Sequence, residues 1–339
     1  ESLMSRLILK NKSNLIVGVG SALVDILLQE SDEFLASTKA EKGGMTLVDS
    51  IYIEDILSKS AEIPTEVPGG SACNTIIGIG NLIKKARFIG KRGDDELGQK
   101  LEYSLRDSNV EPYLNRSKTP TGRVLSIITP DAQRSMFTYL GAASESLPEE
   151  MTEDKFKNAA IVHIEGYLLF NEKLLIAALE SSKKAGAVIS LDLASFTVVE
   201  SSKGILFDIV KDYVDIILAN EDEASSYTNC SDEKEALHLL SRNTEIAIVK
   251  LGKRGSIISY NNDTYNIGIK GTGRALDTTG AGDLWASGFL SGLVNELPLP
   301  TCGALGAKCG YEVCQVIGAH IPGEQWNGIK KEFNLIKSI

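Results

Sequence analysis

A run of small and acidic residues toward the C-terminus is the segment best suited to chemistry. It reads Asp277-Thr-Thr-Gly-Ala-Gly-Asp283 and leads into the apolar, helix-periodic stretch 284–293. The N–H groups of Gly280, Ala281 and Gly282 would lie at a helix N-terminus, where free donors and the helix dipole attract anions. Asp283, beside that anion site, could take a proton from a hydroxyl group. We therefore predict a catalytic helix start, the alternative being that Asp283 merely complements the helix dipole.

A second glycine segment, Val67-Pro-Gly-Gly-Ser-Ala-Cys-Asn-Thr75, also precedes an apolar helical stretch. Its exposed backbone at Gly70 and the amide of Asn74 suit hydrogen bonds to the hydroxyl groups of a substrate. The same residues would serve equally well as a loop and a helix N-cap.

An acidic segment, Asn220-Glu-Asp-Glu223, follows the apolar run Ile216–Ala219. Carboxylate and amide oxygens at the end of a strand could hold Mg²⁺ through water. An acidic helix start capped by Asn220 would have the same sequence.

Two further features could contact anions or a nucleotide. Lys250-Leu-Gly-Lys-Arg-Gly-Ser256 is typical of a strand–turn–strand whose glycines, Gly252 and Gly255, would let a nucleotide ribose approach, or of a plain hairpin. Arg134 lies at the turn of a predicted hairpin and could reach anionic oxygens or simply remain solvated.

The glycines after the first apolar run do not form a dinucleotide-binding fingerprint. Gly18-Val-Gly-Ser-Ala-Leu-Val-Asp25 carries Leu23 where the third glycine would stand, so an NAD-dependent oxidoreductase is disfavoured. The sequence also lacks a P-loop motif, so any ATP site must use another phosphate cradle. Asp25 remains available to bind hydroxyl groups.

The elements that must position these residues alternate along the chain. Short apolar runs predict buried strands, and amphipathic stretches of helical period at 171–184 and 233–241 predict helices between the later ones. This alternation from about 150 to 290 predicts a parallel sheet covered on both faces. The runs lie at 14–20, 86–90, 159–166, 187–191, 216–219 and 245–251.

A smaller sheet is predicted beside this α/β body. Residues 120–129 and 135–140 have the pattern of a β-hairpin, and 43–48 is a further short strand. We expect inserted segments at about 36–55 and 110–141 of a single domain to form a lid that excludes water. A decorative edge or a dimer contact is the alternative.

Composition limits the classes of partner. The 339 residues are 43% hydrophobic and carry a net charge of −10, which disfavours binding to nucleic acid or to anionic membranes. The five scattered cysteines predict reduced thiols rather than zinc ligands or disulfides. The chain opens without a basic head and an apolar run, so we expect a cytoplasmic protein without a secretory signal, and Met4 is a candidate for its natural start.

The order of these motifs resembles the ribokinase-like (PfkB) family of carbohydrate and nucleoside kinases. Gly69-Gly-Ser-Ala-Cys-Asn74 resembles its first signature, Asp277–Asp283 matches its second, and Asn220-x-x-Glu223 resembles its N-x-x-E motif. The resemblance spans roughly residues 15–322. It implies a three-layer α/β/α sandwich with a mostly parallel central sheet and a small β-sheet lid, and ATP-dependent phosphorylation of an alcohol.

The resemblance also implies roles for individual residues. Asp283 would be the base, and the three residues before it would form the anion hole. Asp25, Gly70 and Asn74 would hold ring hydroxyls, Asn220 and Glu223 would organise Mg²⁺, and Lys250–Gly255 would lie along ATP. A monovalent cation such as K⁺ could bind beside Asp277 and Thr279.

Within the family, Gly122 and Asp131-Ala-Gln-Arg134-Ser resemble the adenosine kinases, in which the lid arginine sits by the reacting phosphate. Tyr167 could then pack against a base, although 304–314 lacks the family's adenine-side His or Asn. We therefore expect ATP- and Mg²⁺-dependent transfer to the primary hydroxyl of a nucleoside, adenosine first, by a monomer or homodimer. A ribokinase- or fructokinase-type sugar kinase is the alternative, and a catalytically inactive nucleotide-sensing protein is the alternative of another class.

Overall fold

The computed structural model describes residues 13–38, 40, 42–131 and 133–337. Met4 and Ala132, the latter in the predicted hairpin turn, lie outside the described residues. No helix within these ranges combines the length and the apolar character needed to cross a bilayer.

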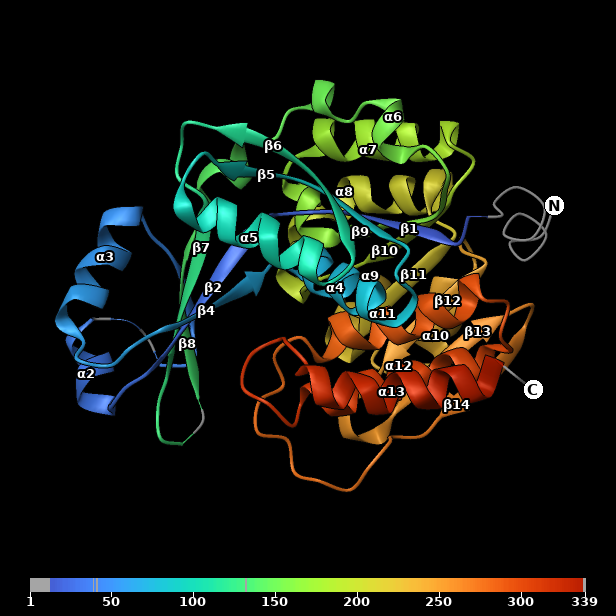
Figure 1. Ribbon diagram of the computed structural model, residues 1–339. Coiled ribbons are helices and arrows are strands. Elements are labelled where there is room, and N and C mark those ends of the chain that lie inside the picture. Colours follow the sequence, from blue (N-terminus) through green and yellow to red (C-terminus); the bar gives the residue numbers. More distant parts are fainter. Residues whose placement is uncertain (1–12, 39, 41, 132, 338–339) are drawn as a thin grey trace.

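A nine-stranded sheet forms the centre of the molecule (Figure 1). Seven neighbouring strands of this sheet are parallel, namely β6, β5, β1, β9, β10, β11 and β12. Strands β13 and β14 extend the sheet beyond β12 in antiparallel pairing. Each predicted apolar run forms one of the parallel strands. The order is β14 (Asp263–Ile267), β13 (Ser256–Tyr260), β12 (Ile246–Lys250), β11 (Ile216–Asn220), β10 (Val188–Asp192), β9 (Ala159–Glu165), β1 (Leu15–Val19), β5 (Ala86–Gly93) and β6 (Val110–Ser117).

Helices cover both faces of this sheet, as the alternating pattern predicted. Because successive residues of a strand point to opposite faces, Ile16 packs in one core cluster and Val17 in another. The first face is covered by α4 (Ser71–Ile83), α5 (Glu96–Asp107), α11 (Ala281–Val294) and α12 (Leu299–Val313), with α13 (Gly323–Lys337) packed on α4 and α12. The second face is covered by α6 (Glu153–Phe156), α7 (Glu172–Lys184), α8 (Phe196–Tyr213), α9 (Glu221–Thr228) and α10 (Glu233–Ser241).

A five-stranded sheet stands beside the main body in the order β3 (Met45–Leu47), β8 (Arg134–Tyr139), β7 (Gly122–Ile128), β2 (Leu23–Gln29) and β4 (Thr65–Gly69). The predicted hairpin forms the antiparallel pair β7–β8. The extent of the sheet differs from the predicted insertions, because β2 and β4 join it from outside those ranges while β6 belongs to the central sheet. Strand β2 thereby carries Asp25 on the small sheet.

Two helices, α2 (Asp32–Ser37) and α3 (Ser50–Lys59), cover the face of the small sheet that is turned away from the main body (Figure 1). Ile53 and Ile56 of α3 are buried in the same cluster as Phe137 of β8. The rings of Tyr52 and Phe137 are 5.7 Å apart. The apolar core on this side of the small sheet therefore belongs to the same buried cluster as Ile16 of the central sheet.

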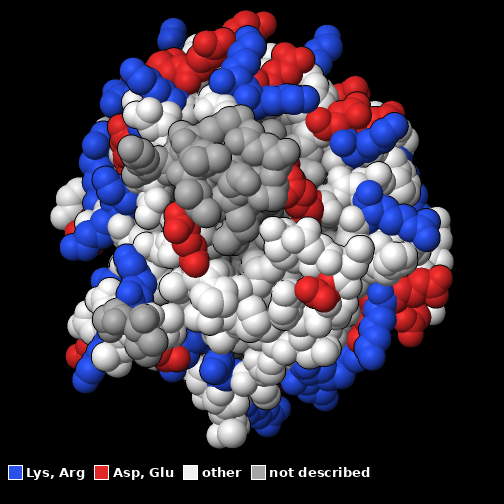
Figure 2. All heavy atoms as spheres, turned by 90° about the vertical axis from the view of Figure 1, so that its right-hand side faces the viewer, with Lys and Arg blue, Asp and Glu red and all other residues white. Residues whose placement is uncertain are grey.

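The face of the molecule in Figure 2 carries charges of both signs. Among the described residues drawn there, Lys and Arg lie intermixed with Asp and Glu, without an extended region of one charge.

Candidate active site

Four polar residues end four neighbouring parallel strands at one edge of the central sheet. Glu165 ends β9, Asp192 ends β10, Asn220 ends β11 and Lys250 ends β12. Asp192 is paired in register with Glu165, and Asn220 with Lys250. Ligands of open α/β sheets bind outside the carboxyl ends of the strands, so this edge is the candidate site.

A cleft of about 600 Å³ opens at this edge. It is bounded by the start of α11, the β12–β13 turn with its short helix η4 (Gly252–Arg254), the loop 269–275 and one side of α12. Its lining includes Asp192, Asn220, Glu223, Lys250, Gly252, Gly255, Gly280, Ala281, Gly282 and Asp283. Residues from the predicted catalytic, magnesium and nucleotide segments therefore line one cavity.

The Asp283 carboxylate is oriented by two donors from α4. Ser71 Oγ donates to Oδ1 at 2.7 Å, and Asn74 Nδ2 donates to Oδ2 at 3.1 Å. Burial raises the pKa of Asp283 to about 6, although these two hydrogen bonds act in the opposite direction. A carboxylate with a pKa near neutrality can accept a proton at physiological pH.

The turn before Asp283 requires glycine at position 280. Gly280 is the N-cap of α11 with φ +74°, and a Cβ atom there would lie 2.6 Å from the Cβ of Ala319. The N–H of Ala281 donates to Thr278 O at 3.2 Å. The first turn of a helix carries N–H groups without helical acceptors, and Gly280, Ala281 and Gly282 all line the cleft.

The small sheet reaches this turn through an ion pair. Arg134 of β8 pairs with Asp277, whose carboxylate also accepts the N–H of Thr279 at 2.9 Å and of Gly318 at 2.8 Å. Although burial alone would raise the pKa of Asp277, these N–H donors and Arg134 outweigh it and lower the pKa. Where the resemblance implies a monovalent cation, the structure thus pairs Asp277 with the guanidinium of Arg134.

Asp25 interacts electrostatically with Arg134 and Asp283. Burial raises its pKa to about 7, with the charge of Arg134 lowering the pKa and that of Asp283 raising it further. A Cβ atom on Gly69 would collide with the Asp25 carboxylate, and one on Gly70, whose φ is +96°, would collide with Ser21 O. The close approach of β2 and the 67–75 segment therefore depends on both glycines.

Glu165, which is not among the predicted site residues, joins the turn after β1 to the start of α4. Its carboxylate is buried and accepts the N–H groups of Ser21 and Ala72, each at 2.9 Å. Burial raises the pKa of Glu165 to about 7. Its only signal in the sequence is its position as a polar residue at the end of an apolar run.

Asn220 and Glu223 form a reciprocal cap at the start of α9. Asn220 Oδ1 accepts the N–H of Glu223 at 2.9 Å, and the Glu223 carboxylate accepts the backbone N–H and the amide of Asn220 at 2.8 and 2.9 Å. The helix-cap alternative is therefore present in the structure, on residues that also line the cleft. Burial, assisted by the charge of Asp192, raises the pKa of Glu223 to about 7.

The donor set fits a hydrated magnesium ion rather than a closed metal cage. Within the described ranges no three His, Cys, Asp or Glu side chains group closely enough to hold a metal directly. Mg²⁺ usually keeps several waters and binds one or two carboxylates together with substrate phosphates. Asp192 and Glu223 supply such oxygens in the cleft.

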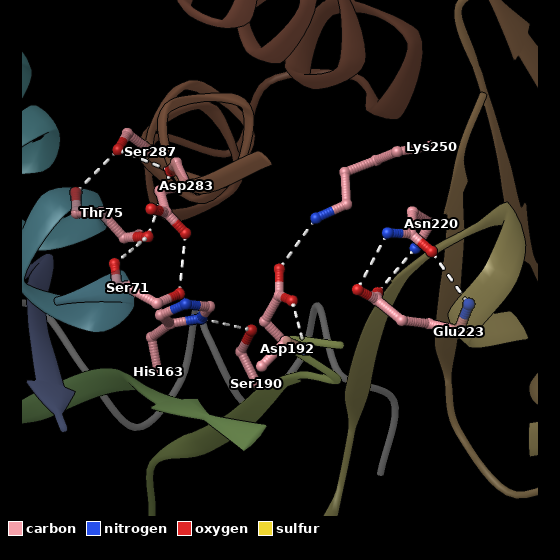
Figure 3. Close-up of polar contacts among 11 residues, drawn as sticks. Ser71, Thr75, His163, Ser190, Asp192, Asn220, Glu223, Lys250, Asp283 and Ser287 are labelled. Carbon is pink, nitrogen blue, oxygen red and sulfur yellow. Dashed lines mark hydrogen bonds and ion pairs between the residues drawn. The ribbon is translucent and has the colours of Figure 1, made fainter. Parts of the chain in front are cut away.

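Asp192 pairs with Lys250 in the middle of the site. Lys250 Nζ lies 2.9 Å from Asp192 Oδ2, between Asp283 on one side and Asn220 and Glu223 on the other (Figure 3). Burial raises the pKa of Asp192, but Lys250 outweighs it and the net shift is downward. Asp192 is not among the predicted site residues, although it directly follows the run 187–191.

Two aromatic residues occupy other parts of the site region. Tyr167, in the short helix η3 (Gly166–Phe170) after β9, is 45% exposed. Tyr311 of α12, not predicted, lines the cleft, and its hydroxyl accepts the N–H of Gly273 at 3.1 Å.

Comparisons with known proteins identify the family. The family model described as pfkB family carbohydrate kinase matches residues 24–326. A solved structure of a probable sugar kinase from Rhizobium etli is 32% identical and superposes with a TM-score of 0.85, covering 94% of this chain and 98% of that one. The adenosine kinase of Sinorhizobium meliloti is 29% identical with a TM-score of 0.85, covering 95% of this chain and 99% of that one.

A curated relative gives a third comparison. The 5-dehydro-2-deoxygluconokinase of Geobacillus kaustophilus is 26% identical over 259 residues, which are 72% of this chain and 77% of that protein. The fold and activity class that the motifs predicted are thereby confirmed, and the chain belongs to the pfkB family of carbohydrate kinases.

Proposed function

We propose that this kinase transfers the γ-phosphoryl group of ATP to the primary hydroxyl of a nucleoside, with adenosine as the first candidate. The observation that carries the proposal is the placement of Asp283 in the cleft, held by Ser71 and Asn74 at the start of a glycine-rich helix. Phosphoryl transfer has a loose transition state that requires positioning and charge stabilisation more than a strong base.

The proposed roles belong to residues that line the cleft and to Asp25, Gly70 and Asn74, which lie outside its lining. Asp283 accepts the proton of the acceptor hydroxyl as the new oxygen–phosphorus bond forms. The N–H groups at the start of α11 stabilise negative charge on the phosphoryl oxygens. Asp25, Gly70 and Asn74 hold the ring hydroxyls, and the turn containing Gly252 and Gly255 lies along the nucleotide.

Magnesium would bind in water-mediated contact with Glu223 and Asn220, where it would neutralise charge on the phosphates of ATP. The small sheet would act as the lid. The ion pair of its Arg134 with Asp277, close to the start of α11, supports this role. A closed lid would keep water from competing with the acceptor hydroxyl.

The nucleoside acceptor is supported by the match to the Sinorhizobium meliloti adenosine kinase over 95% of this chain. Arg134 at the start of β8 and Tyr167 after β9 add the features expected of that branch. Tyr167 is exposed enough, at 45%, to stack on a base.

A free sugar is the second candidate acceptor. The match to the Rhizobium etli probable sugar kinase, at 32% identity, favours it. A sugar needs the hydroxyl-binding residues but no platform for a base, so the two candidates make different demands on Tyr167.

An acceptor panel tests the choice. Purified protein with ATP and Mg²⁺ is assayed for ADP release on adenosine, inosine, ribose and fructose, with a no-acceptor control. We expect the highest kcat/KM on adenosine, and a Tyr167→Ala variant that loses activity on adenosine but not on ribose. Turnover of ribose or fructose alone would exclude the nucleoside assignment.

A further inference from the structure

Lys250 and Asp192 form a buried ion pair whose position in the cleft is not explained by stability alone. Lys250 ends β12 and Asp192 ends β10, two parallel strands that are separated by β11 in the sheet. They are only 14% and 7% exposed, yet both line the cleft. Two buried charges of opposite sign are often no more stable than apolar residues of similar volume, so stability alone does not explain their position.

The ammonium group lies against the first turn of the catalytic helix. A Cβ atom on Gly282 would lie 3.0 Å from Lys250 Nζ. The missing side chain of Gly282 therefore leaves room for the lysine at the N-terminus of α11, where the proposed anion site lies. Lys250 and the backbone N–H groups of that turn present positive charge to the same space.

The Lys250 ammonium also has N–H donors available to a ligand. Of its three N–H bonds, the structure assigns an acceptor to one within the described part of the chain, Asp192 Oδ2 at 2.9 Å. The ammonium of Lys250 lies in a cleft that also contains Asp192, Glu223 and Asp283.

We propose that Lys250 is a catalytic residue whose ammonium contacts the phosphoryl group during its transfer, and that Asp192 is the positioning residue that holds it there. In the step, the acceptor oxygen forms a bond to the γ-phosphorus, the bond from that phosphorus to the β–γ bridging oxygen breaks, the acceptor proton passes to Asp283, and ADP leaves. Lys250 offsets the negative charge on the moving group without losing or gaining a proton. The inference rests on the proposed kinase function.

The test separates charge at the phosphoryl group from support of the fold. Lys250→Met removes the charge and keeps much of the length, Lys250→Arg keeps the charge, and the double variant Lys250→Met/Asp192→Asn avoids a lone buried carboxylate. Lys91→Met is the matched control, because Lys91 is also a buried lysine paired with a carboxylate, Glu150 at 2.8 Å, outside the cleft. For each variant, kcat and KM are measured with ATP, and Kd is measured for ATP and for AMP, which lacks the β- and γ-phosphates.

We expect kcat to fall about 100- to 1000-fold in Lys250→Met and in the double variant, with partial recovery in Lys250→Arg. The Kd for ATP should rise about tenfold or more while the Kd for AMP stays within about twofold. Lys91→Met should unfold at a lower temperature but keep its kcat.

A kcat within about threefold of the parent in both Lys250→Met and the double variant would overturn the proposal. So would a loss of ATP and AMP affinity together, without recovery by arginine, because that pattern reports damage to the fold. A parent protein without kinase activity on any acceptor would instead overturn the proposed function, so the two failures are distinguishable.

Discussion

Ser71 and Asp283 lie 212 positions apart in the chain, yet Ser71 Oγ donates a hydrogen bond to Asp283 Oδ1 at 2.7 Å. Each residue lies in the first turn of a helix, α4 or α11, and the contact joins the 67–75 segment to the 277–283 segment. Thr75 reinforces this junction by donating to Asp283 O at 3.1 Å. The proposed base is therefore held by the same helix that carries Asn74.

Activity should depend on the ionisation of two carboxyl groups. The pKa of Asp283 is raised to about 6 and that of Asp25 to about 7, in both cases chiefly by burial. Both groups gain protons as the pH falls through these values, so kcat/KM should be lost from pH 7 downward with a log–log slope steeper than one. In Asp25→Asn, which should be slower at every pH, the acid limb should be less steep than in the parent. A parent profile that is flat from pH 8 to pH 5 would contradict this assignment.

Glu165→Gln should weaken both stability and acceptor binding. A glutamine side chain offers one oxygen where the carboxylate accepts the N–H groups of Ser21 and Ala72, so one buried donor loses its partner at a cost of about 1–3 kcal/mol. The KM for the acceptor should rise while the KM for ATP stays nearly constant. Glu150→Gln, at the buried pair with Lys91, should lower stability without changing either KM.

Glu165 should also shape the pH dependence of stability. Its pKa is raised from 4.5 to about 7 in the folded protein by burial. A raised carboxyl pKa means that the folded state holds the proton more tightly, so this contribution to the free energy of unfolding is full below pH 4.5 and decreases as the pH rises to 7. Denaturant melts at pH 5 and pH 8 should show a smaller difference for Glu165→Gln than for the parent.

Arg134→Gln should reduce kcat more than it reduces stability. The variant removes the lid cation that meets Asp277 beside the catalytic turn, and we expect a loss of about 100-fold or more, because arginine at a transferring phosphoryl group has large effects. Arg123→Gln is the matched control, since Arg123 lies on the neighbouring strand β7 and pairs with Glu54 of α3 at 2.7 Å. Equal losses of kcat in the two variants would contradict a specific role for Arg134.

Alanine in place of the two turn glycines should have different effects. At Gly280, with φ +74° and a Cβ that would lie 2.6 Å from Ala319 Cβ, alanine should cost at least 1–2 kcal/mol, roughly the penalty of the left-handed region. At Gly282 the new Cβ would meet only the flexible end of Lys250, at 3.0 Å, so kcat should fall while the melting temperature changes little. Gly204→Ala in α8, where a Cβ would meet no side chain or backbone beyond its own helix within 4 Å, should leave kcat unchanged.

Sequence patterns predicted the strands and helix starts that are formed by consecutive residues. The run 216–219 identified β11 and placed Asn220 at its end, and the glycine-rich run before Asp283 identified the start of α11. Glu165 and Asp192 end their strands in the same way, but their roles come from partners far along the chain, such as Ala72 and Lys250. A single polar residue after an apolar run does not indicate which distant residues it will contact.

The composition of the small sheet could not be predicted for a related reason. Strand β2 follows β1 after a short glycine turn and pairs with β4 and β7, from two separate parts of the chain. Its hydrophobic run, buried on both faces from Leu23 to Leu28, has no alternation to indicate a sheet with one exposed face. Tertiary pairing, not local pattern, places Asp25 in the site.

The central claim, that Asp283 is the base of a phosphoryl transfer, is tested most directly by replacing it with asparagine. Asp232→Asn is the matched control, because Asp232 also lies at a helix start, capping α10 through Glu235 N at 2.9 Å, and asparagine caps equally well. With adenosine and ATP as substrates, kcat of Asp283→Asn should fall about 10²- to 10⁴-fold while the Kd for ATP stays within about threefold and Asp232→Asn behaves as the parent. An Asp283→Asn enzyme that turns over at the parent rate would contradict the account.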